Sequence, residues 1–171
     1  DQALPEKLVQ QTVKLVQEVS LAPFWRGVHL EATGVDAQGV IERGAPRGGL
    51  TSVVLVSCNA LACTRRALEA LRAARDADHP IELVVVDNGS TDGSAEWLAE
   101  QADLVLVRNP ANYGAPRARN QALGHCRGEW VAFLDTDVFV PRGWLGRALY
   151  HGAVDPGVGA VALGANRASK H

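Results

Sequence analysis

Methionine is absent from the sequence, even at position 1. A natural chain begins with methionine, so we expect this one to be a processed product or, as the better explanation, a segment of a longer protein. Cysteine is scarce, and Cys58, Cys63 and Cys126 lack the close pairing of a metal site. An odd number of cysteines suits a reducing compartment, where free cysteines usually serve as small buried apolar residues.

Two further features are missing: an excess of positive charge and a long apolar run. The 171 residues carry a formal net charge of −2, whereas a nucleic-acid-binding surface usually needs a basic patch. No apolar run approaches the ~20 residues that cross a bilayer, and the N-terminus has no signal-peptide core. We therefore expect a cytoplasmic protein that binds no nucleic acid and has no transmembrane segment in this chain.

The chain has two parts that differ in pattern. Residues 4–21 have the apolar spacing of an amphipathic helix, and residues 24–49 resemble two short strands followed by a Gly/Pro/Arg linker. We predict an N-terminal extension over residues 1–48 and a separate domain over residues 49–171. The apolar stripe of the predicted helix needs a partner, which could be this domain, a preceding domain or another subunit.

From Leu50 onward, strand-like and helix-like segments alternate regularly. Continuous apolar runs predict strands at 50–57, 81–88, 103–109, 129–137 and 158–164. Helical spacing predicts helices at 60–75, 94–102, 114–126 and 143–153. Apolar strands separated by helices indicate an α/β fold with a mainly parallel sheet covered on both faces. In such a sheet the ligand site lies beyond the carboxyl ends of the strands.

Asp135 and Asp137 end the predicted strand 129–137. Side chains alternate along an extended backbone, so both carboxylates would leave the strand on the same face. Two nearby carboxylates repel each other unless a cation lies beside them, and Mg²⁺ or Mn²⁺ is often shared between carboxylates and substrate phosphates. The pattern favours a metal-assisted phosphate site. The alternative is that Asp135 caps a turn and Asp137 is solvated, because aspartate favours turns.

A second polar segment, "VVVDNGSTDGS", follows the predicted strand 81–88. Asp87 ends the strand, Gly89 permits a tight turn, and Asp92 or Ser94 can cap the next helix. Such a turn could bind a nucleobase edge or a ribose through Asp87. The alternative is an ordinary βα loop, which explains the composition but not the second acidic cluster at the same sheet edge.

Four segments in order, "SVVLVSCNALACTRRALEAL", "IELVVVDNGSTDGSAEWL", "VRNPANYGAPRARNQALGHCRGEWVAFLDTDV" and "DPGVGAVALGAN", resemble the family 2 glycosyltransferases of the GT-A fold. The resemblance covers about residues 50 to 166 and is more specific than any one motif. It implies a Rossmann-like nucleotide-binding half, and transfer of a sugar from a nucleotide-diphosphate donor to an acceptor hydroxyl with inversion. It also implies Mn²⁺ or Mg²⁺ as the cofactor.

The resemblance also assigns roles to residues. The nucleoside would be bound by Ser57, Cys58, Asn59 and Asp87, with Asn88 as a second candidate for the base edge. Gly114 would give backbone access, and Arg119 would lie near the nucleotide or the acidic cluster. In "LDTD", Asp135 would face ribose or metal, Thr136 would line the nucleotide site, and Asp137 would be the main metal ligand.

The sequence departs from the family pattern at three points. Cys58 stands where many relatives have an aromatic residue that stacks on the base, which leaves the donor base open. Ala122 replaces a common glycine, which we interpret as helix packing. The general base and the acceptor region are expected beyond residue 171, because His151, Asp155 and His171 are not convincing substitutes.

Two alternatives remain open on the sequence. One is a GT-A-like domain that binds a nucleotide sugar without turning it over alone. The other is an unrelated doubly wound regulatory domain of the receiver type, although receivers place an acidic pair after the first strand, where this chain reads "SCN". Nucleotidylyltransferases need a glycine-rich phosphate loop after that strand, and "SCNALACT" contains no glycine.

Overall fold

The computed structural model describes residues 46–155 and 157–163. The predicted N-terminal helix and almost all of the predicted extension lie outside the described residues. Strand β1 begins at Arg47, three residues before the predicted start at Leu50, so the end of the expected linker is already part of the sheet. No helix in the described part of the chain is long and apolar enough to span a membrane.

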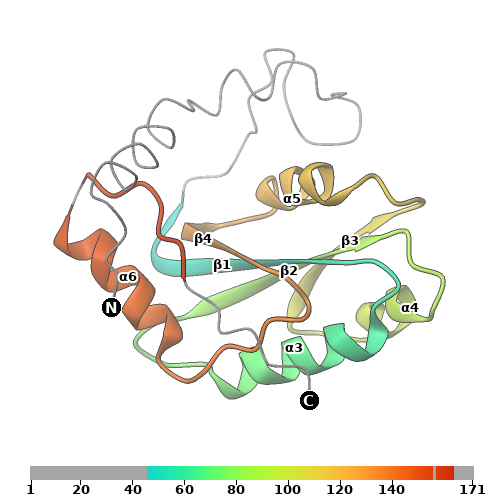
Figure 1. Ribbon diagram of the computed structural model, residues 1–171, viewed down its shortest axis with the longest axis horizontal. Helices are drawn as coiled ribbons and strands as arrows, with labels where there is room; N and C mark the ends of the chain where they lie inside the picture. The colour runs from blue at the N-terminus through green and yellow to red at the C-terminus, as the bar shows by residue number, and fades with distance from the viewer. Residues whose placement is uncertain (1–45, 156, 164–171) are drawn as a thin grey trace, which may run out of the picture.

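Four parallel strands form the sheet of the described domain, in the order β3-β2-β1-β4 (Figure 1). Their bounds are Arg47–Ser57 for β1, Ile81–Asn88 for β2, Leu104–Asn109 for β3 and Gly128–Leu134 for β4. Their β-branched and leucine-rich sequences have no polar alternation because both faces of the sheet are covered. The predicted parallel α/β fold is therefore confirmed.

Helices cover the two faces unequally. Helices α3 (Leu61–Ala73), α4 (Ser94–Ala99) and α6 (Trp144–Val154) lie on one side of the sheet, and α5 (Ala115–Leu123) lies on the other (Figure 1). Successive strand residues point to opposite faces. The α3 side buries Val53, Leu55, Leu68, Leu71, Leu83, Val85, Leu98 and Trp144, and the α5 side buries Val54, Val84, Val86, Ala118, Ala122 and Cys126.

Two predictions about strands are wrong. Strand β4 ends at Leu134, and the chain then turns, with the Val138 N–H donating to the Asp135 carbonyl at 3.1 Å. Aspartate at the first position of a turn stabilises this geometry, so Asp135 and Asp137 are not placed by strand alternation. Residues 158–163 form no strand; they follow a turn in which Asp155 accepts hydrogen bonds from the backbone N–H groups of Gly157 and Val158.

The cysteines differ in exposure. Cys126 is buried against α5, as expected for a small apolar residue, whereas Cys58 is half-buried and Cys63 is exposed. The expectation of burial is therefore wrong for Cys63, which lies on the outer side of the first turn of α3.

Gly89 allows the loop after β2 to lie directly against the loop after β3. It has a φ of +76°, and a Cβ added there would come within 2.4 Å of the Ala111 carbonyl carbon and 2.8 Å of the Asn112 nitrogen. Only glycine can adopt this backbone conformation while two backbone segments of the protein lie so close together. The position of the two loops relative to each other therefore depends on this residue.

Replacing Gly89 with alanine should lower the free energy of unfolding by about 3 kcal/mol, because a strained φ and a clash with backbone atoms add together. Gly49→Ala is the matched control. Gly49 has a φ of +75° but nothing within 4 Å of an added Cβ, so it should cost only about 1 kcal/mol. Urea denaturation measures both values, and equal losses would contradict the close approach at Gly89.

Candidate functional site

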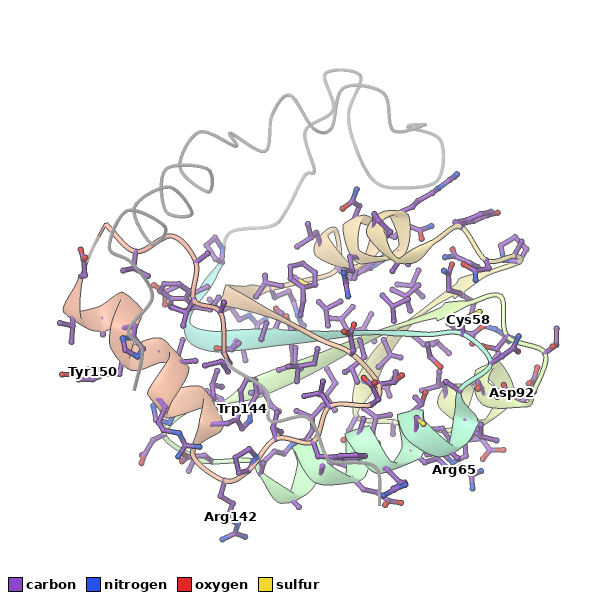
Figure 2. The ribbon with its side chains drawn as sticks, in the orientation of Figure 1. Cys58, Arg65, Asp92, Arg142, Trp144 and Tyr150 are labelled. Atoms are coloured by element: carbon purple, nitrogen blue, oxygen red, sulfur yellow. The ribbon has the colours of Figure 1, made fainter. Side chains whose placement is uncertain are left out.

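The predicted site residues lie at one edge of the sheet because all four strands are parallel. Ser57, Asp87 and Arg108 are level with one another in the strand register. Leu55 pairs with Leu134, so Asp135 leaves the sheet at the level of Val56. Figure 2 shows Cys58 and Asp92 at this end of the molecule, away from Tyr150 on α6. The carboxyl edge therefore collects the polar ends of β1, β2, β3 and β4.

Asn59 and Ser57 hold the β1 loop in place. The Asn59 N–H donates to Ser90 Oγ at 3.0 Å, and Asn59 Oδ1 accepts from the Thr91 N–H at 2.7 Å. These bonds favour the left-handed φ of +50° at Asn59. Ser57 is fully buried and lies 2.8 Å from Thr64 Oγ1. Ser57 and Asn59, two of the residues that the resemblance assigns to the nucleoside, are thus bonded to protein groups.

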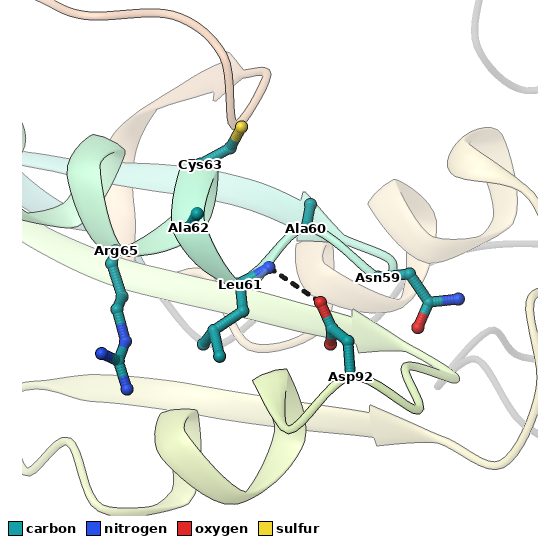
Figure 3. A pocket seen from close by; sticks show the side chains of 7 residues that line it. All are labelled: Asn59, Ala60, Leu61, Ala62, Cys63, Arg65 and Asp92. Carbon is teal, nitrogen blue, oxygen red and sulfur yellow. Dashed lines mark hydrogen bonds between the residues drawn. The ribbon is translucent and has the colours of Figure 1, made fainter.

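Asp92 stabilises the starts of two helices. Its carboxylate accepts from the Leu61 N–H at 3.0 Å and from the Ser94 N–H at 3.1 Å, as Figure 3 shows for the first of these bonds. The bond to the next helix was predicted, but the bond to α3 was not. The Ser94 hydroxyl and the Leu61 N–H hold the pKa of Asp92 below its ordinary value.

A cavity of about 520 Å³ lies beside this loop, between the start of α3 and Asp92 (Figure 3). Its lining residues are Asn59, Ala60, Leu61, Ala62, Cys63, Arg65 and Asp92. Of the predicted site residues it contains Asn59 alone. Asp87, Asp135 and Asp137 take no part in its lining, so the cavity meets the predicted nucleotide site only at Asn59.

Asp87 is the described residue whose burial most clearly indicates a ligand. It is 2% exposed; its Oδ2 accepts from the Ser90 N–H at 3.2 Å, and its Oδ1 is buried with no hydrogen-bond partner among the described residues. A buried carboxylate oxygen without a donor is unfavourable, and nearly all such groups in proteins are bonded. A ligand N–H or O–H group would satisfy this oxygen.

Amide side chains join the ends of β2 and β3 to α5. Asn109 and Gln121 exchange two hydrogen bonds, of 2.8 and 2.9 Å. Asn109 also donates to Asn88 Oδ1 at 2.9 Å, and the Tyr113 N–H donates to the same oxygen at 3.1 Å. Asn88 is only 2% exposed. The predicted candidate for the base edge is therefore enclosed by protein groups.

The segment between β3 and α5 reaches back to β1. Asn112 donates from Nδ2 to Cys58 Sγ at 3.3 Å, and its Oδ1 accepts from the Gly114 N–H at 2.9 Å. Gly114 has a φ of +81° and precedes the first turn of α5. The Arg117 guanidinium lies 4.3 Å from the centre of the Tyr113 ring. Sequence reasoning used only Gly114 here, although "NYG" already placed Asn112 and Tyr113 next to it.

Asp135 and Asp137 form an exposed acidic pair beyond β4. Arg119 Nη2 donates to Asp135 Oδ1 at 2.7 Å, so the predicted nearness of Arg119 to the acidic cluster is observed. Thr136 is half-buried between the two aspartates. In the described part of the chain, no hydrogen bond or ion pair involves the Asp137 carboxylate, and no hydrogen bond joins Asp87 to either aspartate.

The acidic pair fits a hard divalent cation only in part. Among the described residues there is no group of three or more His, Cys, Asp or Glu side chains that could hold a metal. Two carboxylates supply too few ligands for a closed protein site, but Mg²⁺-type ions are commonly held by one or two carboxylates together with substrate phosphates and water. The donor set thus fits an ion that binds together with a phosphorylated ligand.

The fold and this edge define an α/β protein with a ligand site beyond the carboxyl ends of a parallel sheet. The chain belongs to glycosyl transferase family 2, whose family model matches residues 52–164. Family membership excludes the alternative of an unrelated receiver-like regulatory domain. It also agrees with the motifs from which the resemblance was inferred.

The chain is also similar to individual glycosyltransferases. The pre-mycofactocin glycosyltransferase of Mycobacterium tuberculosis is 36% identical over 121 residues, which cover 70% of this chain and 24% of that protein. The structure of S. aureus TarS 1-349 in complex with UDP-GlcNAc is 27% identical, with a TM-score of 0.54, and covers 61% of this chain and 31% of that one.

A second solved structure covers more of the chain. The mannosyltransferase PcManGT from Pyrobaculum calidifontis, in complex with GDP-Man and Mn²⁺, is 26% identical with a TM-score of 0.54. The match covers 88% of this chain and 42% of that one. The chain thus spans about a quarter of the length of the mycobacterial relative and less than half of each of these two structures.

Asp92 should contribute stability that depends on pH. Its pKa is lowered in the folded protein, so its contribution is full above its ordinary value of 3.8 and is lost as the pH falls through the folded value. Asp92→Asn should therefore lower the melting temperature at about pH 7, and its difference from wild type should shrink below about pH 4.

The control for Asp92→Asn is Glu69→Gln on α3. Glu69 is exposed and makes no hydrogen bond or ion pair with the described residues. Its effect on the melting temperature should be small at every pH. A difference between wild type and Asp92→Asn that does not change with pH would argue against the hydrogen bonds from Leu61 and Ser94 to the Asp92 carboxylate.

Proposed function

We propose that this chain forms the donor-binding part of a glycosyltransferase that moves a sugar from a nucleotide-diphosphate sugar to an acceptor hydroxyl, with inversion and with a divalent cation. The observation that carries the proposal is the buried Asp87 oxygen, which has no donor among the described residues, at the same sheet edge as the exposed Asp135 and Asp137. One end of the edge suits a nucleoside, and the other suits a diphosphate with its metal.

The nucleoside would lie against the ends of β1 and β2. Asp87 Oδ1 would accept an N–H group of the base, and Cys58 would face the base from the β1 loop. Uracil, thymine and guanine each present a ring N–H beside a carbonyl, so this contact alone does not choose among them. The named relatives include one structure with UDP-GlcNAc and one with GDP-Man, which supports a nucleotide donor of either kind.

The diphosphate would lie at the end of β4. Asp137, and Asp135 on its side away from Arg119, would hold Mn²⁺ or Mg²⁺, and one neighbouring structure contains Mn²⁺ with its donor. When bound, such an ion supplies positive charge where the leaving diphosphate gains negative charge. Arg119 lies 2.7 Å from Asp135 and would add a second positive charge at this place.

The acceptor and the general base remain predictions outside the described edge. A base must take the proton of the acceptor hydroxyl. His151 and Asp155 are exposed at the end of α6, away from the strand ends, and do not serve this purpose. A domain that binds the donor without turning it over alone remains the second candidate, and the cytoplasmic location stays a prediction.

Calorimetric titration with UDP, GDP and dTDP, with and without Mn²⁺, tests the proposal directly. Wild type should bind at least one of them, about ten-fold more tightly with Mn²⁺, and Asp137→Ala should abolish this gain because the ion loses its protein ligand. Glu100→Ala is the control: it removes an exposed carboxylate at the end of α4, and its nucleotide affinity should still rise when Mn²⁺ is added. Binding that ignores both metal and Asp137 would reject the metal assignment.

Asp87→Asn separates binding from stability. The amide can keep its oxygen toward the Ser90 N–H, which places an N–H group where the ligand N–H should be accepted. Nucleotide affinity should fall at least ten-fold, while the melting temperature stays equal or rises because a buried charge is removed. Calorimetry and thermal unfolding measure the two effects. Unchanged affinity would show that the base does not contact Asp87.

A further inference from the structure

Asn88 lies next to Asp87 and makes its contacts with protein groups. Its Oδ1 accepts from Asn109 at 2.9 Å and from the Tyr113 N–H at 3.1 Å. Its Nδ2 donates to Asn112 Oδ1 at 2.8 Å. An amide oxygen can accept about two hydrogen bonds, so this oxygen is already satisfied. With 2% of its surface exposed, Asn88 has little surface left for a base edge.

Asn112 connects Asn88 to the β1 loop through hydrogen bonds to both. Its Oδ1 is oriented by two donors, Asn88 Nδ2 and the Gly114 N–H at 2.9 Å. Because the oxygen is fixed in this way, the amide nitrogen points the other way, where it donates to Cys58 Sγ at 3.3 Å. The three side chains Asn88, Asn112 and Cys58, here called the amide relay, connect the ends of β2 and β1 through the segment between β3 and α5.

We infer that Asn88 is a positioning residue for the nucleotide site: through Asn112 it fixes the place and orientation of Cys58, the residue that faces the base. This inference rests on the proposed donor-binding function and replaces the prediction that Asn88 contacts the base edge itself. It also gives Cys58, which has no aromatic face, a defined position beside Asp87.

The close contact at Gly89 restricts the backbone of Asn112, which is the middle residue of the amide relay. The loop after β2 and the segment at Ala111 and Asn112 are in contact, with 2.8 Å between an added Gly89 Cβ and the Asn112 nitrogen. The backbone of Asn112 therefore cannot move toward β2, and the direction of its side chain depends on Asn88. The Asn109–Gln121 pair points instead toward α5, so it holds the helix and leaves the β1 loop to the relay.

A double-mutant cycle on nucleotide affinity tests the relay. Asn88→Ala and Asn112→Ala should each weaken binding of the nucleoside diphosphate that wild type binds by about ten-fold, and the double variant should be no weaker than either. Ser52→Ala is the control. Ser52 is buried and bonded to Glu82 and Gly128 at the opposite end of the sheet, so it should lower the melting temperature and leave affinity unchanged.

The reactivity of Cys58 gives a readout that needs no nucleotide. In a Cys63→Ser background, iodoacetamide labelling of Cys58, followed by mass spectrometry, should be several-fold faster in Asn88→Ala and Asn112→Ala than in wild type, because the β1 loop is no longer held by Asn112 and the half-buried Cys58 becomes more accessible to the reagent. Ser52→Ala should label at the wild-type rate. Asn112 is exposed, so its variant tests the relay even if Asn88→Ala does not fold.

The outcomes separate the relay from the donor-binding proposal. If the loss of affinity in the double variant equals the product of the losses in the two single variants, the relay is overturned, because Asn88 would then act without Asn112. Labelling rates equal to those of Ser52→Ala would overturn it as well. If wild type binds no nucleotide, the donor-binding proposal fails, and the labelling rates alone decide whether Asn88 positions Cys58.

Discussion

The parallel pairing of β1 with β2, from Thr51–Ile81 to Ser57–Asp87, is the constraint on which the described structure depends. Over this paired stretch both strands are mostly buried, and their alternate residues supply the centre of both hydrophobic clusters. Parallel pairing forces each connection to leave from the carboxyl edge, cross a face of the sheet and re-enter at the amino edge, so that every strand ends at the same carboxyl edge. As a result, segments 30 or more residues apart in sequence meet at one edge, where Asn59 contacts Thr91 and Asn112 contacts Cys58.

Most polar groups at this edge are used to hold the loops together. Ser57, Asn59, Asn88, Asp92 and Asn109 all bond to other protein groups. The exceptions are therefore informative: Asp87 Oδ1 is buried without a donor, and Asp137 is exposed without a partner in the described chain. A frame of bonded amides, a hydroxyl and the Asp92 carboxylate, which presents a few unpaired carboxylate oxygens, suits a site whose ligands bring the complementary groups.

The sequence predicted the sheet well because apolar strands and their order depend on strong, local patterns. It also placed Arg119 near the acidic cluster and Asp87 at a strand end. The prediction from the sequence was wrong where a turn determines the backbone conformation. The segment "DTD" follows an apolar strand and was predicted to continue it, but in the structure it forms a turn. The amide contacts of Asn88 and Asn112 could not be predicted, because they depend on how closely Gly89 lets two loops approach, which no local pattern encodes.

The buried alanines of α5 have a consequence for how the charged end of the sheet edge can be adjusted. Ala118 and Ala122 are completely buried between α5 and the sheet, and their short side chains set the distance between helix and strands. Arg119 and the Gly114 turn are carried by this helix. A single added methylene at either alanine would lift the helix and move the guanidinium away from Asp135. The spacing of a helix from its sheet is thus a means of adjusting the charged end of the edge without changing any residue there.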